Sequence, residues 1–245
     1  MKIPSDVVNR FSGRLFLHET ARFFAVLLLL QIPLAAYSFD QLTEPQLLVY
    51  ETSHLKETRE GSAISYTYLV EKLDTNESIE DKVSLSILKE HEDDRRDVSL
   101  EFLSGEFNLP LPDFQKYRGN PVIIGMLEHI AQMLGRETGG GTLYFRNRIR
   151  DRLADEKIEI VKSELEVSGD SDGNSGGNGK QVQTSFSFSP LANDPFVAEN
   201  IALTESVITL TFSEDVPGNV VSINFVSGPL EKPVLTRALE YSGVE

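Results

Sequence analysis

Three segments in the first half of the chain alternate apolar and polar residues. The pattern runs through residues 64–70, 83–87 and 98–102, where Ile, Tyr, Val, Leu or Phe stands at every second position. A period of two with one polar side is typical of half-buried antiparallel strands. Polar runs at residues 74–78 and 90–94 separate these segments, so we predict three neighbouring strands joined by turns.

A helical period replaces the alternation after residue 120. Asn120 suits an N-cap and Pro121 suits the first helical position, and Gly135 is the predicted end of the helix. The apolar residues that follow a spacing of three and four positions form one stripe: Ile123, Leu127, Ile130 and Leu134.

A second helix is predicted to begin at Thr142, directly after the three glycines at residues 139–141. Phe145, Ile149 and Leu153 then lie one turn apart and form an apolar stripe. Two short helices joined by a glycine-rich loop predict a helical hairpin.

The last third of the chain returns to strand-like segments. Residues 169–179 contain no apolar residue and predict a flexible hairpin tip. Five further strands are predicted, at residues 158–167, 182–188, 208–212, 221–225 and 234–241.

This order of strands, helical pair and strands predicts an α+β fold. About eight or nine alternating strands are too many for one flat layer in a chain of 245 residues. We therefore expect a curved antiparallel β-sheet, shaped like a half-barrel, with the two-helix hairpin at its centre. Residues 109–114, stiffened by two prolines, predict an extended connection that serves as a crossover, a lid or a docking strip.

The first 38 residues have the order of a secretory signal peptide. An apolar run at residues 25–36 ends in small residues, and Ala36 and Ser38 stand at positions −3 and −1 of a cut before Phe39. The basic residues that precede this run are Lys2, Arg10, Arg14 and Arg22.

The apolar part of this segment is shorter than the roughly 20 residues of a membrane-spanning helix. We therefore expect cleavage after Ser38, which removes residues 1–38 and leaves residues 39–245 as a single α+β domain in the periplasm. The alternative is an uncleaved signal that anchors the same domain in the inner membrane.

Composition and charge narrow the range of partners. The chain has 38 acidic and 23 basic residues and a formal net charge of −15, which argues against binding to nucleic acid or to anionic lipid surfaces. It has no cysteine, so an exported product would have neither disulfides nor a lipid anchor on cysteine. Hydrophobic residues make up 40% of the chain, which suffices for a packed core.

The predicted second helix carries four arginines within seven residues. Helical spacing places Arg146 and Arg150 on one side of its apolar stripe and Arg148 and Arg152 on the other. Arginine holds carboxylate or phosphate through two parallel hydrogen bonds, so these side chains are candidates for binding an anion or an acidic partner. The alternative is that they pair with the protein's own carboxylates.

The residues before this helix extend the candidate site. Gly139, Gly140, Gly141 and Thr142 offer backbone N–H groups at a helix N-terminus, which favours anions. A nucleotide-binding loop is not predicted, because Gly141 stands where a P-loop has its lysine.

The sequence gives little support for a metal site or a cofactor site. Residues 170–174 alternate oxygen ligands as calcium loops do, but Ser175 and Gln181 stand where an EF-hand needs glycine and glutamate. We expect no cofactor and no bound metal. Glu128 and His129 are predicted to lie on the polar side of the first helix, with Gln132 nearby, and are the candidates for acid–base catalysis.

Together these features predict an exported, periplasmic, non-enzymatic protein. We expect it to bind an apolar or amphiphilic ligand sheltered by sheet and helices, or a protein of the cell envelope, with Arg146, Arg150 and residues 139–141 holding an acidic group. A structural or assembly factor, whose own helices fill the sheet's inner face, is the first alternative. A hydrolase-type enzyme that uses Glu128 and His129 is the second.

Overall fold

The computed structural model describes residues 41–167 and 179–245. The predicted signal peptide, and nearly all of the predicted hairpin tip with its calcium-like residues, lie outside the described residues. The strands are β1 (Ala63–Lys72), β2 (Glu77–Glu90), β3 (Arg96–Phe102), β4 (Phe114–Tyr117), β5 (Val161–Val167), β6 (Gly179–Phe188), β7 (Val207–Phe212), β8 (Val220–Ser227) and β9 (Leu235–Val244). The helices are α2 (Glu44–Tyr50), α3 (Pro121–Thr138), α4 (Thr142–Leu153), α5 (Ile201–Thr204) and the short 3-10 helix η1 (Gly105–Phe107).

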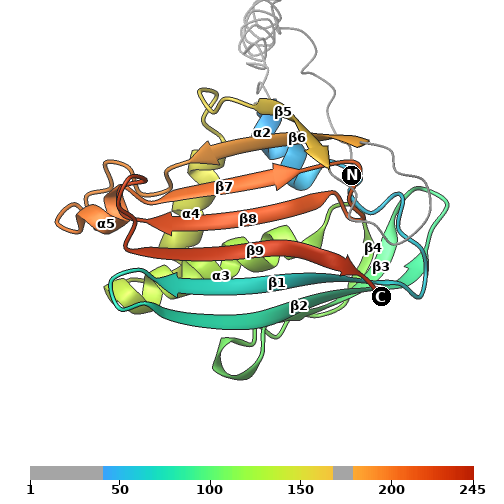
Figure 1. The fold of residues 1–245 in the computed structure, drawn as a ribbon, viewed down its shortest axis with the longest axis horizontal. Coiled ribbons are helices and arrows are strands. Elements are labelled where there is room, and N and C mark those ends of the chain that lie inside the picture. Colours follow the sequence, from blue (N-terminus) through green and yellow to red (C-terminus); the bar gives the residue numbers. More distant parts are fainter. Residues whose placement is uncertain (1–40, 168–178) are drawn as a thin grey trace, which may run out of the picture. The chain divides into compact units, whose positions relative to one another are not determined.

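All nine strands belong to one antiparallel sheet in the order β4-β3-β2-β1-β9-β8-β7-β6-β5 (Figure 1). β1 pairs with both β2 and β9, so an early strand and the last strand meet near the centre of the sheet. The sheet does not close, and β4 and β5 form its two edges. The predicted α+β fold with a curved antiparallel sheet is confirmed.

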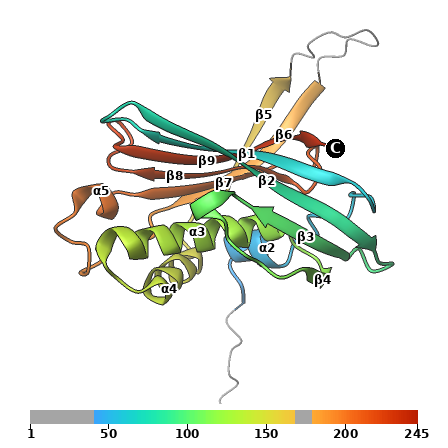
Figure 2. The same cartoon turned by 90° about the horizontal axis from the view of Figure 1, so that it is seen from below.

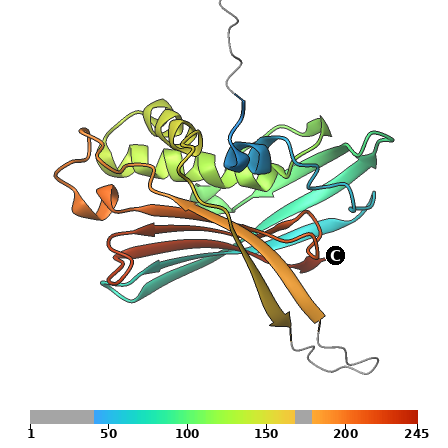
Figure 3. The same ribbon diagram turned by 90° about the horizontal axis from the view of Figure 1, so that it is seen from above.

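The helices α2, α3 and α4 lie on one face of the sheet (Figures 2 and 3). α3 and α4 follow one another as a helical hairpin, as predicted. Within the described ranges, no helix is both long enough and apolar enough to cross a membrane.

One side of α3 packs directly on the inner face of the sheet. Ile123, Met126 and Ile130 are fully buried, as are the inward-facing residues Tyr66 and Leu85 of the sheet. The space between sheet and α3 is therefore filled with side chains that exclude water.

Close approach of α3 to the sheet depends on Gly125. A Cβ atom at this position would lie 2.7 Å from a ring carbon of Phe102 on β3. Glycine is the one residue type that fits at this distance without a shift of the ring.

The end of α3 differs from the prediction. The helix continues through Gly135 and ends at Thr138, and Gly139 takes the left-handed conformation of a C-cap with φ of 70°. Close packing explains the glycine at position 135 instead. A Cβ there would lie 3.2 Å from the carbonyl oxygen of Gly140. The prediction that Gly135 ends the helix is wrong.

Four short elements are not predicted by the sequence: α2, α5, β4 and η1. α2 begins with a capping box, in which the Thr43 side chain accepts from the backbone N–H of Gln46 and the Gln46 side chain accepts from that of Thr43. The Thr43 hydroxyl also donates to the carbonyl oxygen of Leu153 at 2.9 Å, which fixes α2 beside the end of α4.

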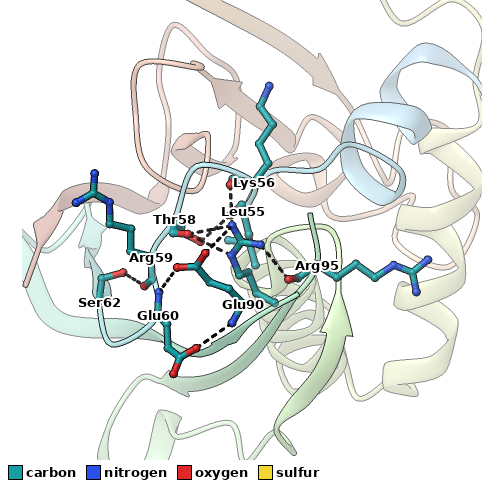
Figure 4. Close-up of polar contacts among 9 residues, drawn as sticks. Leu55, Lys56, Thr58, Arg59, Glu60, Ser62, Glu90 and Arg95 are labelled. Carbon is teal, nitrogen blue, oxygen red and sulfur yellow. Dashed lines mark hydrogen bonds and ion pairs between the residues drawn. The ribbon is translucent and has the colours of Figure 1, made fainter. Parts of the chain in front are cut away.

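A cluster of polar contacts, drawn in Figure 4, fastens the loop between α2 and β1 to the sheet. Arg96 on β3 donates to the carbonyl oxygens of Lys56 at 2.7 Å, Thr58 at 3.1 Å and Arg95 at 3.0 Å. The Arg96 residue is 4% exposed. Backbone carbonyls thus satisfy the donors of a cation that would otherwise be costly to bury.

Candidate functional site

An apolar groove with a volume of about 560 Å³ lies on the side of α3 that faces away from the sheet. It is bounded by α2, α3, α4 and the extended segment before β4. The lining residues are Tyr50, Leu109, Pro110, Leu111, Ile124, Leu127, Glu128, Gln132, Arg146, Ile149 and Arg150.

The floor of the groove is apolar because two helical stripes meet there. Leu127 of α3 and Ile149 of α4 are buried beneath it, and Leu109 forms an isolated bridge to Phe102 that holds the extended segment against the sheet. Ile124 and Leu111 are half-buried and form the walls. Residues 109–111 thus border the groove.

One side of the rim carries a fixed ion pair between the two helices. The Arg146 guanidinium donates two hydrogen bonds of 2.7 Å to the carboxylate of Glu128, and Gln132 donates a third at 3.1 Å. Burial alone would raise the pKa of Glu128, but these hydrogen bonds and the charge of Arg146 hold it below its usual value. At neutral pH Glu128 is therefore ionised, and its carboxylate is already bonded to Arg146 and Gln132.

Arg150 is the less constrained cation of the groove. Its side chain is 63% exposed, and its ion pair is a 3.2 Å contact with the neighbouring Asp151. Tyr50 lines the same groove from α2, and its pKa is raised by burial, an effect opposed by the positive charge of Arg150. Arg150 and the neutral Tyr50 hydroxyl therefore offer hydrogen-bond donors at one part of the rim.

The other two arginines turn to the opposite side of α4, as helical spacing requires. Arg148 forms an ion pair of 2.7 Å with the buried carboxylate of Asp194 and lies 4.9 Å from the ring centre of Tyr144. Arg152 donates to the carbonyl oxygen of Ala192. Both hold the segment before α5 in place, and neither lines the groove.

The glycine loop also lies apart from the groove. Gly139 is the C-cap of α3 and Gly141 the N-cap of α4, where Thr142 begins the helix. A Cβ on Gly140 would lie 2.9 Å from the rings of both Phe145 and Phe196. The tight turn between the two helices thus explains why glycines stand at these positions.

Glu128 and His129 have different partners and do not form a pair. Glu128 faces Arg146, whereas His129 is 3% exposed and makes a 2.9 Å hydrogen bond with the Tyr68 hydroxyl on β1. The expectation that His129 lies on the polar side of the helix is wrong. Burial, with the nearby charges of Arg237 and Arg136, lowers its pKa to about 4.

A second hollow of about 470 Å³ lies between the segment after α2 and strands β5, β6 and β7. His54 borders it, stacks on Phe212 with ring centres 5.4 Å apart, and makes a 2.7 Å hydrogen bond with the carbonyl oxygen of Leu48. Its pKa is lowered by burial. The polar lining includes Lys162 and Asp215, so this hollow lacks the apolar character of the groove.

Sequence reasoning missed Tyr50 and Gln132 as residues of the groove. Tyr50 was missed with α2, although Thr43, Pro45 and Gln46 carry the signal of a capping box with proline in the first turn. Helical spacing places Gln132 beside Glu128, but only the fold shows that Arg146 meets Glu128 there.

No group of three or more His, Asp or Glu residues in the described part of the chain has the arrangement of a metal site. The groove offers hydrogen-bond donors and apolar contact. Comparison of the chain with protein-family models and with curated proteins finds no match.

Proposed function

We propose that the protein is an exported, non-enzymatic binding protein that holds an amphiphile with an acidic head group in the groove between α2, α3 and α4. The observation that carries this proposal is the combination of an apolar floor with the exposed guanidinium of Arg150 at the same rim. A volume of about 560 Å³ lies within the usual range of small-molecule pockets.

The two parts of the groove suit the two parts of such a ligand. An alkyl chain laid over Leu111, Ile124 and Leu127 removes apolar surface from water, at about 25 cal/mol for each Å². A carboxylate at Arg150 gains charge-assisted hydrogen bonds. Arg146 is occupied by Glu128, so Arg150 and the Tyr50 hydroxyl are the proposed head-group contacts.

This proposal moves the ligand from the place that the sequence suggested. The inner face of the sheet is occupied by α3, and residues 139–141 lie outside the groove lining. The ligand is therefore proposed on the outer side of the helical layer, and its head group is not assigned to the glycine loop.

A structural or assembly factor without a small ligand is the second candidate. The direct packing of α3 on the sheet favours it, because a filled inner face is what such a factor needs. Ligand binding in the groove separates the two candidates.

Export is part of the same proposal and has its own test. Mass spectrometry of the protein recovered from the periplasm of the expressing bacterium should give a chain that begins at Phe39. An intact N-terminus in the inner-membrane fraction would instead support the anchored form.

Isothermal titration with dodecanoate below its micelle concentration tests the groove. We expect saturable binding, and we expect Arg150→Ala to weaken it by a factor of about 10 to 100, the value of one charge-assisted hydrogen bond. Arg59→Ala is the matched control, because Arg59 is exposed and lies outside the groove.

Two further probes make the result specific. Dodecanol, which has the same chain without the charge, should bind more weakly than dodecanoate, and dodecyltrimethylammonium should bind more weakly still. Absence of dodecanoate binding, or equal binding to the wild type and to Arg150→Ala, would contradict the proposal.

A further inference from the structure

The strand β5 is an open edge of the sheet. Among the described residues its strand neighbour is β6 alone. The unpaired N–H and C=O groups of such an edge can pair with another strand. The β5–β6 ribbon also extends from the sheet away from α3 and α4 (Figures 2 and 3), and residues 161–165 are exposed.

The opposite edge is protected. β4 has four residues, follows prolines at positions 110 and 112, and contains Lys116 with a positive φ of 49°. Short length, proline and local twist are features that prevent edge pairing. β5 has seven residues, none of them proline or glycine.

The two faces of β5 carry different side chains. Val161 and Leu165 lie on one face with Ser163 between them, and they are 54% and 46% exposed. Lys162 and Glu164 lie on the other face. Glu164 forms a 2.8 Å ion pair with Lys180 on β6, whereas Lys162 has no ion pair among the described residues.

We propose that β5 pairs antiparallel with β5 of a second copy of this chain, centred on Ser163. In this register Val161 of one copy faces Leu165 of the other, and Lys162 of one copy faces Glu164 of the other. Each pair occurs twice, because the two copies are related by a twofold axis. Within residues 161–165, apolar residues thus face apolar residues and Lys162 faces its opposite charge, Glu164. Residues 166 and 167 extend past this segment, opposite residues 160 and 159 of the other copy.

Neighbouring registers lack this agreement. Centring on Lys162 places two ammonium groups opposite one another, and centring on Glu164 does the same with two carboxylates, which is unfavourable. A shift by one residue places Val161 opposite Glu164 and mixes the two faces. The order Val-Lys-Ser-Glu-Leu therefore selects the register centred on Ser163.

The hydrogen-bonding pattern of the backbone also allows this register. Residues of an edge strand alternate between those that bond inward to the neighbouring strand and those that point outward. Partners in the proposed register are both odd-numbered or both even-numbered, so outward groups always meet outward groups. The contact is short, and we therefore expect a reversible dimer whose population rises with concentration.

Charge reversal tests the pairing in sedimentation velocity experiments over a concentration series, on the protein purified after expression of the full chain. Lys162→Glu and Glu164→Lys each place like charges opposite one another, and each should lower the association constant at least tenfold. A one-to-one mixture of these two variants should restore association, because the acidic β5 of one then faces the basic β5 of the other. This restoration cannot arise from a folding defect.

A cysteine cross-link tests the register directly, because the chain has no cysteine of its own. Ser163→Cys places two thiols opposite one another at a Cα separation of about 4.5 to 5.5 Å, within the range of a disulfide. Mild oxidation should then give a covalent dimer. Ser185→Cys on β6 is the control and should remain monomeric.

Several results would overturn the proposal. They are a wild type that stays monomeric at the highest concentration, single charge reversals that associate like the wild type, a mixture that does not recover, or a cross-link as efficient at residue 185 as at residue 163. A protein strand of a different partner on β5 would appear as the first of these results.

Discussion

Three consecutive glycines between α3 and α4 meet three different environments. Gly139 has a positive φ of 70° with open space around it, Gly140 lies against two phenyl rings, and Gly141 has an ordinary φ of −80° and open space. Substitution by alanine therefore separates backbone strain from crowding.

We expect Gly140→Ala to lower the free energy of unfolding by about 1 to 3 kcal/mol, because the new Cβ crowds Phe145 and Phe196. Gly139→Ala should cost about 1 to 2 kcal/mol through the left-handed backbone. Gly141→Ala is the control, with a change within about 0.5 kcal/mol. Urea denaturation measures all three, and equal effects would contradict this assignment.

His129 predicts how stability depends on pH. Its pKa is about 4 in the folded protein and about 6.5 in the unfolded chain, so between these values the unfolded state binds the extra proton. Stability is therefore lost as the pH falls from 6.5 towards 4. Linkage gives a loss of about 2 kcal/mol between pH 7 and pH 5 from this residue alone.

The variant His129→Gln should reduce the difference in unfolding free energy between pH 7 and pH 5 by about that amount. Comparing the pH difference, and not the stability at one pH, removes the cost of lost packing against Tyr68 and Phe102. An unchanged pH difference would show that His129 is not the group responsible.

At the residue scale, the sequence predicts which side chains share a face of a helix better than it predicts the residues that they contact. Helical spacing separates Arg146 and Arg150 from Arg148 and Arg152, because a period of 3.6 residues fixes which side chains share a face. It does not reveal that Asp194 will meet Arg148, since a loop 46 positions away supplies it. Contacts of this kind depend on the fold.

At the scale of elements, Arg96 connects the loop after α2 to β3. We expect Arg96→Ala to lower the free energy of unfolding by about 2 to 4 kcal/mol, because it leaves the buried carbonyl of Thr58 and the part-buried carbonyl of Lys56 without this donor. Thermal or urea denaturation measures the change. Arg59→Ala in the same loop should change stability by less than about 0.5 kcal/mol, because its guanidinium points away from the cluster in Figure 4.

A loss at Arg96 no larger than at Arg59 would show that the loop is held by other contacts. The variant Arg96→Lys adds a second comparison. Lysine keeps the charge but has no planar fork to reach several carbonyls, so we expect it to recover little of the loss.

The elements that the sequence predicts well are the long and strongly periodic ones. β1, β2, β3, α3 and α4 each bury one face, and that burial imposes a period on the residues. β4 and α5 have four residues each, too few for a period to be visible. Gly135 shows another limit, because glycine for close packing and glycine for a helix end look the same in a sequence.

At the scale of the whole molecule, the class of fold follows from the order of its elements, but the position of the groove does not. The sequence favours a ligand sheltered between sheet and helices. The structure shows α3 packed on the sheet, and the groove arises where α2, α4 and residues 109–111 meet on its outer side. Four separate segments, spread over residues 50–150, build this surface, so the pattern within any one of them carries no signal for it.

The central claim is that the groove binds an acidic amphiphile, and photolabelling tests it most directly. A dodecanoate analogue with a diazirine at the end of its chain would be irradiated with the purified protein, and the labelled peptides identified by mass spectrometry. We predict saturable labels within residues 109–111 and 124–132, which excess dodecanoate removes and Arg150→Ala weakens. Labelling that does not saturate, or that falls mainly beside His54 in the second hollow, would contradict the claim.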